Sequence, residues 1–226
     1  MPLTTEHRNI NVGGDDLDLS CIKDVPTFII DVGVSAGTPW LYESFPNANY
    51  VLIDPLNVVD ELNIYLSKMD YKFHEVALSS EDGGILTINM DTEQPALSSI
   101  LPLSKHNERG HELKEIKVNK RRLDSLLNEE YKEEVTSNTT LLKIDTEGYE
   151  LEIVKGATEI LEHIDYLICE VSVYDRFENG YTLLDLLSFL DKQGFILSEV
   201  LRFAKLNGKV VVGDMLFIKK GRKNES

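Results

Sequence analysis

Hydrophobic residues in this chain form short unbroken runs, separated by polar turns and by segments with helical spacing. The runs 28–30 and 50–53 are apolar without alternation, as expected for parallel strands that are covered on both faces. Further strands are predicted over 71–78, 138–144 and 166–171. Helical spacing predicts helices over 38–45, 58–69, 122–127, 150–161 and 182–193. The alternation of the two predicts an α/β fold with a doubly wound, mostly parallel sheet.

One region departs from this alternation. A strand over 85–90 follows a turn instead of a helix, and 112–118 alternates like an edge strand. A polar, serine-rich loop from Pro95 to Gly110 joins them. Loops of this length usually carry function or are mobile, so we expect an insertion after the third strand, beside the ligand pocket.

The C-terminal part predicts an antiparallel pair that closes the sheet. The runs 195–203 and 210–219 flank Asn207 and Gly208, and Asn-Gly is a strong hairpin signal. Nicotinamide-binding domains normally lack such a pair. We divide the chain into an N-terminal lead-in (1–24), one domain (25–220) and a basic tail (221–226).

Composition limits the classes of protein that need to be considered. The chain has 226 residues, of which 42% are hydrophobic and 27% charged, as is usual for one soluble globular domain. No apolar run approaches the ~20 residues that cross a bilayer, and the polar start lacks a signal-peptide core, so we expect a cytoplasmic protein. A net charge of −16 disfavours a nucleic-acid partner. Neither cysteine has a CxxC partner, so zinc and redox motifs of that kind are absent.

The first predicted strand runs into a turn with glycine at Gly33 and Gly37 and with Ser35 between them. Asp31 precedes the turn, and Asp54 ends the next strand. This spacing differs from the dinucleotide pattern G-x-G-x-x-G, and an acid before the turn would repel a pyrophosphate. Asp31 suits the ammonium group of an amino-acid-like ligand, and Asp54 suits ribose hydroxyls. S-adenosylmethionine (SAM) has both groups and no phosphate, so the pattern favours a methyltransferase; a purely structural tight turn is the alternative.

A second group of polar residues follows the strand 138–144. Asp145 and Glu147 come directly after it, at the edge where ligands bind in open α/β sheets. Lys143 lies two residues before Asp145 and points to the same side, with Asp145 or Glu170 as its partner. The two acids either cap the helix that begins at Glu150, through its dipole, or take part in catalysis. Their spacing alone does not decide between these roles.

The run Lys143 to Glu150 resembles the FkbM family of SAM-dependent methyltransferases, as do 154–157 and 168–172. Further matches, in the family's order, are 31–37, 54–55, 76–79, 98–100 and 122–126. Together they extend over most of residues 28–218. The resemblance implies a class I methyltransferase (Rossmann-like) fold, SAM as the cofactor, and usually O-methylation of a hydroxyl on a sugar, glycan or other small-molecule natural product.

The resemblance also assigns roles to individual residues. The cofactor would be bound by the turn, by the end of the second strand and by the tip of the third, that is by Asp31, Gly33, Val34, Ser35, Gly37, Asp54, Pro55, Ala77, Leu78 and Asp145. Ala77 and Leu78 would lie against the adenine. Asp145 or Glu147 would act as the general base, supported by Lys143 or Glu170.

Several alternatives remain at this stage. His74, His106 and His111 are competing bases, and Asp145 with Glu170 is a conceivable Mg²⁺ site, although no metal is assigned. Trp40 and Tyr42 are expected in the core rather than in an aromatic cage. The second functional hypothesis is a binding or partner module whose cofactor site is weakened by Ser35 and Asp54, which stand where the family more often has other residues.

Overall fold

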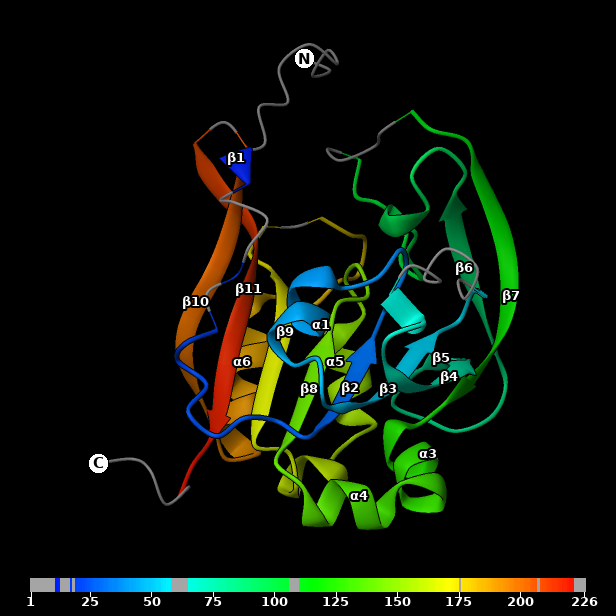
Figure 1. Cartoon of the computed structure of the whole chain (residues 1–226). Coiled ribbons are helices and arrows are strands. Elements are labelled where there is room, and N and C mark those ends of the chain that lie inside the picture. Colours follow the sequence, from blue (N-terminus) through cyan, green and yellow to red (C-terminus); the bar gives the residue numbers. More distant parts are fainter. Residues whose placement is uncertain are drawn as a thin grey trace.

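The computed structural model describes residues 11–12, 17, 19–57, 65–105, 110–174, 176–206 and 208–221 (Figure 1). Its centre is an eight-stranded sheet in the order β1-β10-β11-β9-β8-β2-β3-β4. The strands are β1 (Asn11–Val12), β2 (Phe28–Val32), β3 (Asn49–Asp54), β4 (Asp70–Glu75), β8 (Thr140–Ile144), β9 (Tyr166–Ser172), β10 (Phe195–Leu206) and β11 (Lys209–Lys219). Strands β4, β3, β2, β8 and β9 are parallel, and β11, β10 and β1 are antiparallel to their neighbours. The predicted doubly wound sheet with its antiparallel hairpin is confirmed.

The middle strands are apolar without alternation because both faces of the sheet are covered. All residues of β2 and β8 are buried. Ile30 and Leu142 pack into the hydrophobic cluster on one face, and Ile29 and Leu141 pack into the cluster on the other. Burial on both faces removes the polar positions that would otherwise alternate along the strand.

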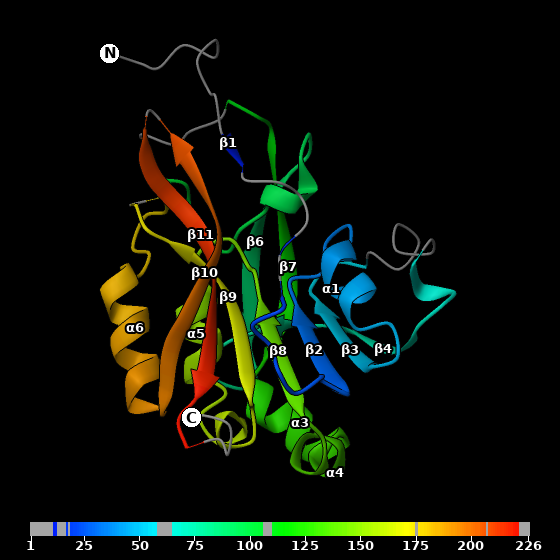
Figure 2. The same cartoon turned by 60° about the vertical axis from the view of Figure 1, so that its left-hand side comes forward.

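The two faces carry different elements (Figure 2). One is covered by α3 (Leu123–Glu130), α4 (Lys132–Ser137), α5 (Glu150–Lys155), the 3₁₀ turn η3 (Ile160–Glu162) and α6 (Leu183–Lys192). The other is covered by α1 (Pro39–Ser44) and by an extended segment that buries Leu17, Leu19 and Ile22. This segment takes the place of a helix over the C-terminal half of the sheet.

The predicted strand 71–78 is divided between two sheets. β4 pairs with β3, whereas β5 (Ala77–Leu78) pairs with β7 (Leu113–Arg121) in a second sheet of order β5-β7-β6, where β6 is Ile85–Asp91. The break falls at Val76, whose N–H donates to Asp54 O at 3.2 Å. The apolar pattern could not reveal this break because both halves are extended and partly buried.

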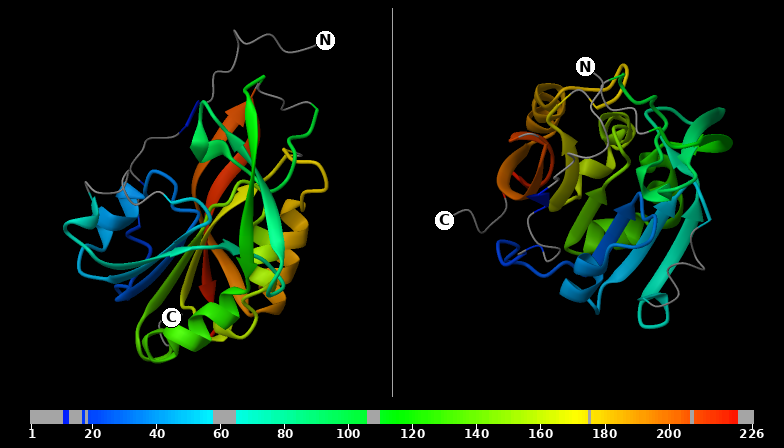
Figure 3. Two further views of the ribbon diagram at one scale, coloured as in Figure 1. Left: turned by 90° about the vertical axis from the view of Figure 1, so that its right-hand side faces the viewer. Right: turned by 90° about the horizontal axis from the view of Figure 1, so that it is seen from above.

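The insertion itself is confirmed, with one correction. The segment that contains β7 was predicted as an edge strand, but β7 lies between β5 and β6. The loop after β6 contains the 3₁₀ turn η2 (Pro95–Leu97). Seen from above, the insertion lies on one side of the central strands and the β10–β11 hairpin on the other (Figure 3).

Two helices end at residues other than those predicted from the sequence. The helix predicted over 122–127 extends to Glu130 as α3, and α4 follows it directly because Tyr131 and Val135 are buried in the core. The helix expected over 150–161 stops at Lys155. A Cβ on Gly156 would lie 2.0 Å from the carbonyl oxygen of Ser79, so the chain turns there at close contact with another segment.

The remaining boundaries agree well with the sequence. Thr182 and Asp185 form a capping box at the start of α6, and Gly194 follows the helix with φ +81°. Thr38 precedes α1 and Pro39 begins it, although the Thr38 side chain makes no capping hydrogen bond. Both hairpin strands are longer than predicted.

Some expectations fall outside the described residues. These are the turn residue Asn207, His106, most of the helix expected over 58–69, most of the lead-in, and the tail after 221. Within the described part of the chain, no helix has the length and apolar character needed to cross a bilayer.

Candidate active site

A cavity of about 770 Å³ opens at the carboxyl ends of β2, β3 and β8. Its floor includes the turn after β2 and the loop after β8. The insertion contributes one wall through residues 95–100, and Arg202 on β10 lies at the opposite side. The volume is in the range of roughly 300–1,000 Å³ that is usual for small-molecule sites. The cavity is therefore placed where ligands bind in open α/β sheets.

The turn after β2 adopts a conformation that few side chains tolerate. Gly33, Ser35 and Gly37 all have positive φ, at +76°, +45° and +104°. A Cβ on Gly33 would lie 1.8 Å from the backbone oxygen of Asp145. Glycine is therefore required at position 33 because the backbone packs closely against the loop that follows the neighbouring strand β8. Val34 is buried, and it lines the cavity together with Ser35 and Gly37.

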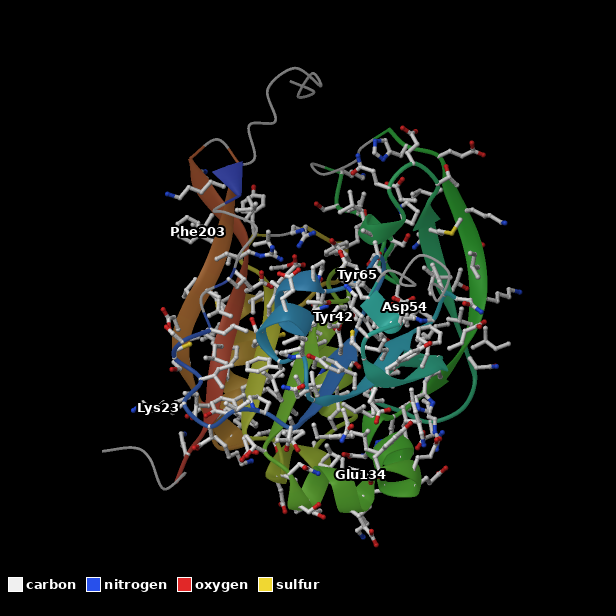
Figure 4. All side chains as sticks on the ribbon, viewed as in Figure 1. Lys23, Tyr42, Asp54, Tyr65, Glu134 and Phe203 are labelled. Atoms are coloured by element: carbon white, nitrogen blue, oxygen red, sulfur yellow. The ribbon has the colours of Figure 1, made fainter. Side chains whose placement is uncertain are left out.

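Asp54 ends β3 and faces the same cavity (Figure 4). Its Oδ2 accepts from Ser35 N at 2.9 Å, and its Oδ1 accepts from Leu56 N at 2.8 Å. Burial raises the pKa of Asp54, while these two N–H groups oppose the rise. Each carboxylate oxygen has a second lone pair, so Asp54 keeps acceptor capacity for a ligand. Pro55, Ala77 and Leu78 line the cavity nearby, as the sequence predicted.

Lys143 lies on β8 between two carboxylates. Its Nζ is 3.1 Å from Asp31 Oδ1 and 3.7 Å from Asp145 Oδ2, and it donates to Gly33 O at 3.1 Å. Burial lowers the pKa of Lys143, but the charges of Asp31 and Asp145 outweigh burial and hold it above its ordinary value. The expected partner Asp145 is found, whereas the other expected partner, Glu170, is not in contact with Lys143.

Asp31 does not face the cavity, contrary to the sequence-based expectation. Its side chain is completely buried, and its Oδ2 accepts from the Tyr42 hydroxyl at 2.9 Å. Together with Lys143 it forms a buried charge pair beneath the turn. In this structure the acid before the turn therefore holds the lysine, and Tyr42 belongs to the core as predicted.

The loop after β8 is shaped by Glu150. Its Oε1 accepts from Thr146 N at 2.9 Å and from Gly148 N at 3.0 Å, while its Oε2 accepts from Tyr181 Oη at 2.8 Å. Burial raises the pKa of Glu150, and the backbone hydrogen bonds oppose this. Glu147 adopts φ +52° in this loop. Glu150, rather than Asp145 or Glu147, is thus the acid that organises the start of α5.

Glu147 and Glu170 share one cation. Arg176 forms ion pairs with both, through Nη2 to Glu147 and through Nη1 to Glu170 at 3.1 Å. Burial raises the pKa of Glu170, and the nearby charges of Asp145 and Glu147 raise it further. The hydroxyl of Ser99 donates to the backbone oxygen of Glu147 at 2.6 Å, which ties the insertion to this loop.

Two of the three histidines proposed as competing bases, His74 and His111, lie elsewhere. His74 Nε2 is 2.6 Å from Tyr131 Oη, and His111 Nδ1 is 2.8 Å from Asp91 Oδ2. Neither of them lines the cavity. Trp40 packs against the core, as predicted, and it also lines the cavity.

Sequence reasoning did not assign a role to Arg176, Glu150 or Arg202. Arg176 follows a strand end, where cations are common on solvated surfaces, and only the fold brings it to Glu147. Glu150 was considered only as a helix start. Arg202 lies in a strand predicted from its apolar neighbours, and nothing in that pattern indicates that its side chain reaches the cavity.

Residues 27–197 match the family model of the methyltransferase FkbM domain. No curated protein matches the chain in sequence. Solved structures found by similarity include magnesium protoporphyrin IX methyltransferase from Synechocystis with bound SAM, at 11% identity and TM-score 0.46, over 87% of this chain and 70% of that chain. Others are a TehB-like SAM-dependent methyltransferase from Corynebacterium glutamicum (11%, 0.43, over 87% and 82%) and a Burkholderia thailandensis 1,6-didemethyltoxoflavin-N1-methyltransferase (10%, 0.45, over 86% and 71%).

Proposed function

Because the chain belongs to the FkbM methyltransferase family, we propose that it transfers a methyl group from SAM to a hydroxyl oxygen of a sugar, glycan or other small-molecule natural product. The family membership makes it a SAM-dependent methyltransferase. The oxygen acceptor and its chemical class are the proposed part. The partly exposed carboxylate of Asp145, at the wall of the cavity and next to the turn, is the observation that carries the proposal.

The residues present fit the cofactor. Asp54 would accept hydrogen bonds from the ribose hydroxyls, because its two oxygens retain free lone pairs after binding Ser35 N and Leu56 N. Ala77 and Leu78 offer apolar contact for the adenine. The left-handed turn at Gly33, Ser35 and Gly37 brings backbone to the cavity wall.

Asp145 is the best general base among the carboxylates of the cavity. Its side chain is 28% exposed, against 10% for Glu147. Glu147 forms an ion pair with Arg176. Asp145 lies 3.7 Å from Lys143 and lines the cavity. Asp145 is therefore the group best placed to take a proton from an acceptor hydroxyl.

The reaction needs few groups. SAM supplies an electrophilic methyl group whose transfer is an in-line displacement, so positioning is a large part of catalysis. Asp145 accepts the hydroxyl proton as the new O–C bond forms. Lys143, anchored by Asp31, keeps the Asp145 carboxylate in place. Glu147 and Glu170, oriented by Arg176, line the side of the cavity where the acceptor would lie.

Calorimetry with SAM and with S-adenosylhomocysteine tests the cofactor, and methyl-labelled SAM with a panel of hydroxylated acceptors tests the transfer. We expect donor binding, and a labelled product in which the methyl is attached to oxygen. A labelled product with the methyl on nitrogen or carbon would contradict the proposed acceptor atom. Absence of both donor binding and transfer would favour the alternative of a partner module with a methyltransferase fold.

A further inference from the structure

Arg202 is held in place by one acid while most of its guanidinium remains available. Its Nε forms an ion pair with Oδ2 of Asp214, which is 4% exposed, whereas the Arg202 side chain is 27% exposed. Within the described part of the chain, no residue makes a hydrogen bond or ion pair with Nη1 or Nη2 of Arg202. Arg202 also lines the cavity. A guanidinium fixed at Nε presents two parallel donors to a ligand, which matches the geometry of carboxylate and phosphate groups.

Sheet register places this arginine at the end of one of two short rows of charged residues. Asp31 lies opposite Lys143 on β2 and β8, whereas Glu170, Asp214 and Arg202 lie opposite one another on β9, β11 and β10. Lys143 itself lies opposite Ile168, two residues before Glu170, so the two rows are offset. Arg202 is the member of these rows that is furthest from the cofactor turn.

The width of the cavity leaves room for a second ligand beside the donor. Its lining extends from Asn57, just after β3, to Arg202 on β10, and these strands are five positions apart in the sheet. At the usual strand spacing this is about 24 Å. Asp54 is at the donor end, and Figure 4 shows it apart from Phe203, the neighbour of Arg202 on β10.

On the proposed function, we infer that Arg202 binds an anionic group, a carboxylate or a phosphate, on the acceptor. The inference rests on the proposed methyl transfer at Asp145. The backbones of β10 and β8 are three strands apart, or about 14 Å at the usual spacing, and the side chains of Arg202 and Asp145 both line the cavity. The anionic group therefore lies toward the β10 side of the acceptor and the reacting hydroxyl toward the β8 side.

The acids of the site do not prevent an anionic group from binding at Arg202. Glu147 and Glu170 are paired with Arg176, Asp145 is paired with Lys143, and Asp214 is paired with Arg202 itself. The donor adds positive charge when it is bound. Lys143 is shared by Asp31 and Asp145, and Arg176 is shared by Glu147 and Glu170, so acids outnumber cations here and the positive charge of the donor offsets part of the excess. An acceptor anion is therefore held by the two unused N–H donors of the Arg202 guanidinium.

The test uses three disaccharides with the same ring skeleton: a neutral one, one with a terminal uronate, and one with a terminal 6-phosphate. Binding to the full chain saturated with S-adenosylhomocysteine is measured by calorimetry. We expect the uronate, the phosphate or both to bind about tenfold or more tightly than the neutral sugar, the gain expected of a charge-assisted pair. The two charged arms distinguish a carboxylate from a phosphate acceptor.

Variants assign this preference to Arg202. R202Q should remove the preference for the charged sugars. R202K should retain part of this preference, because the charge stays while the paired donors are lost. K205Q, on the same strand, should leave the preference unchanged. Thermal unfolding checks that each variant folds, and R202K provides the test if R202Q does not. Equal binding of neutral and charged sugars, no binding of either charged sugar to the loaded protein, or a preference that survives R202Q and R202K overturns the inference. Failure to bind S-adenosylhomocysteine would instead reject the proposed function.

Discussion

The α-carbon of Gly33 faces the backbone oxygen of Asp145 so closely that a Cβ would lie 1.8 Å from that oxygen. Asp145 N also donates to Val32 O at 3.0 Å. The turn that would hold the donor and the loop that carries the proposed base therefore form one rigid unit across β2 and β8. Their relative position is set by these backbone contacts, to which the Lys143 side chain adds by donating to Gly33 O and pairing with Asp145.

Gly33→Ala is expected to be strongly destabilising. The residue would be forced to adopt φ +76° and would also overlap with Asp145, so we expect a loss of more than about 3 kcal/mol in the free energy of unfolding. Gly83→Ala is the matched control, with φ +74° and nothing within 4 Å of its Cβ. The control isolates the backbone strain, about 1–2 kcal/mol. Urea denaturation of both variants measures the difference, and equal losses would show that the close contact is not important.

Asp145→Asn is expected to reduce methyl transfer by about 100-fold or more, because the amide cannot take up the hydroxyl proton. Affinity for S-adenosylhomocysteine should change by only a few-fold, since the proposed ribose and adenine contacts lie at Asp54, Ala77 and Leu78. Asp70→Asn, at the start of β4, is the control. Single-turnover rates with labelled donor check the prediction, and transfer at the wild-type rate would remove Asp145 from the mechanism.

Glu150→Ala is expected to destabilise the protein by about 2–4 kcal/mol, because it leaves buried N–H groups of Thr146 and Gly148 without an acceptor. Glu150→Gln keeps one acceptor oxygen and should be milder. The control Glu152→Ala, on the solvent side of α5, should cost less than about 1 kcal/mol. Chemical denaturation gives the three values, and equal losses for Glu150→Ala and Glu152→Ala would refute the assigned role.

Stability should fall in mild acid partly because of His74. Burial lowers the pKa of His74 in the folded state, and Arg121 and Lys72 lower it further against the opposing effect of Glu130. Below the ordinary value of about 6.5, the unfolded chain therefore binds a proton that the folded chain does not. The stability contributed by neutral His74 is present above this pH and is lost as the pH falls from there through the folded pKa.

His74→Gln should accordingly weaken the pH dependence of unfolding between pH 7.5 and pH 5. His163→Gln, at an exposed histidine, should leave the dependence unchanged. Denaturation midpoints at both pH values test this. An identical slope for wild type and His74→Gln would show that His74 does not contribute.

The sequence predicted the parts of the fold that depend on local pattern. Unbroken apolar runs located the parallel strands, and glycine, proline and capping residues located most turns and the ends of α6. The errors arose where a segment's structure depends more on the distant segment that it contacts than on its own residues. Val76 carries no signal that the strand divides there, and the early end of α5 depends on the contact between Gly156 and Ser79, which are far apart in the sequence.

The candidate site shows the same division. Motifs located Gly33, Asp54 and Asp145, which lie at ends of strands and follow the chain's own order. The role of Asp31 was misjudged because its pairing with Lys143 and Tyr42 depends on strand register and on the packing of α1. Arg202 lines the cavity and Arg176 pairs with Glu147 and Glu170 beside it, both from segments whose local sequence is ordinary, so only tertiary structure reveals their positions.

The pairing of β5 with β7 has a consequence for engineering of this protein. Ala77 and Leu78 line the cavity and are at the same time hydrogen-bonded in register with Lys120 and Arg121 of the insertion. Exchange of the whole insertion for that of another protein would therefore disturb the proposed adenine wall as well as the acceptor side. Chimeras that replace only the segment between β6 and β7 leave this pairing intact, and they are the route by which acceptor range can be altered without loss of donor affinity.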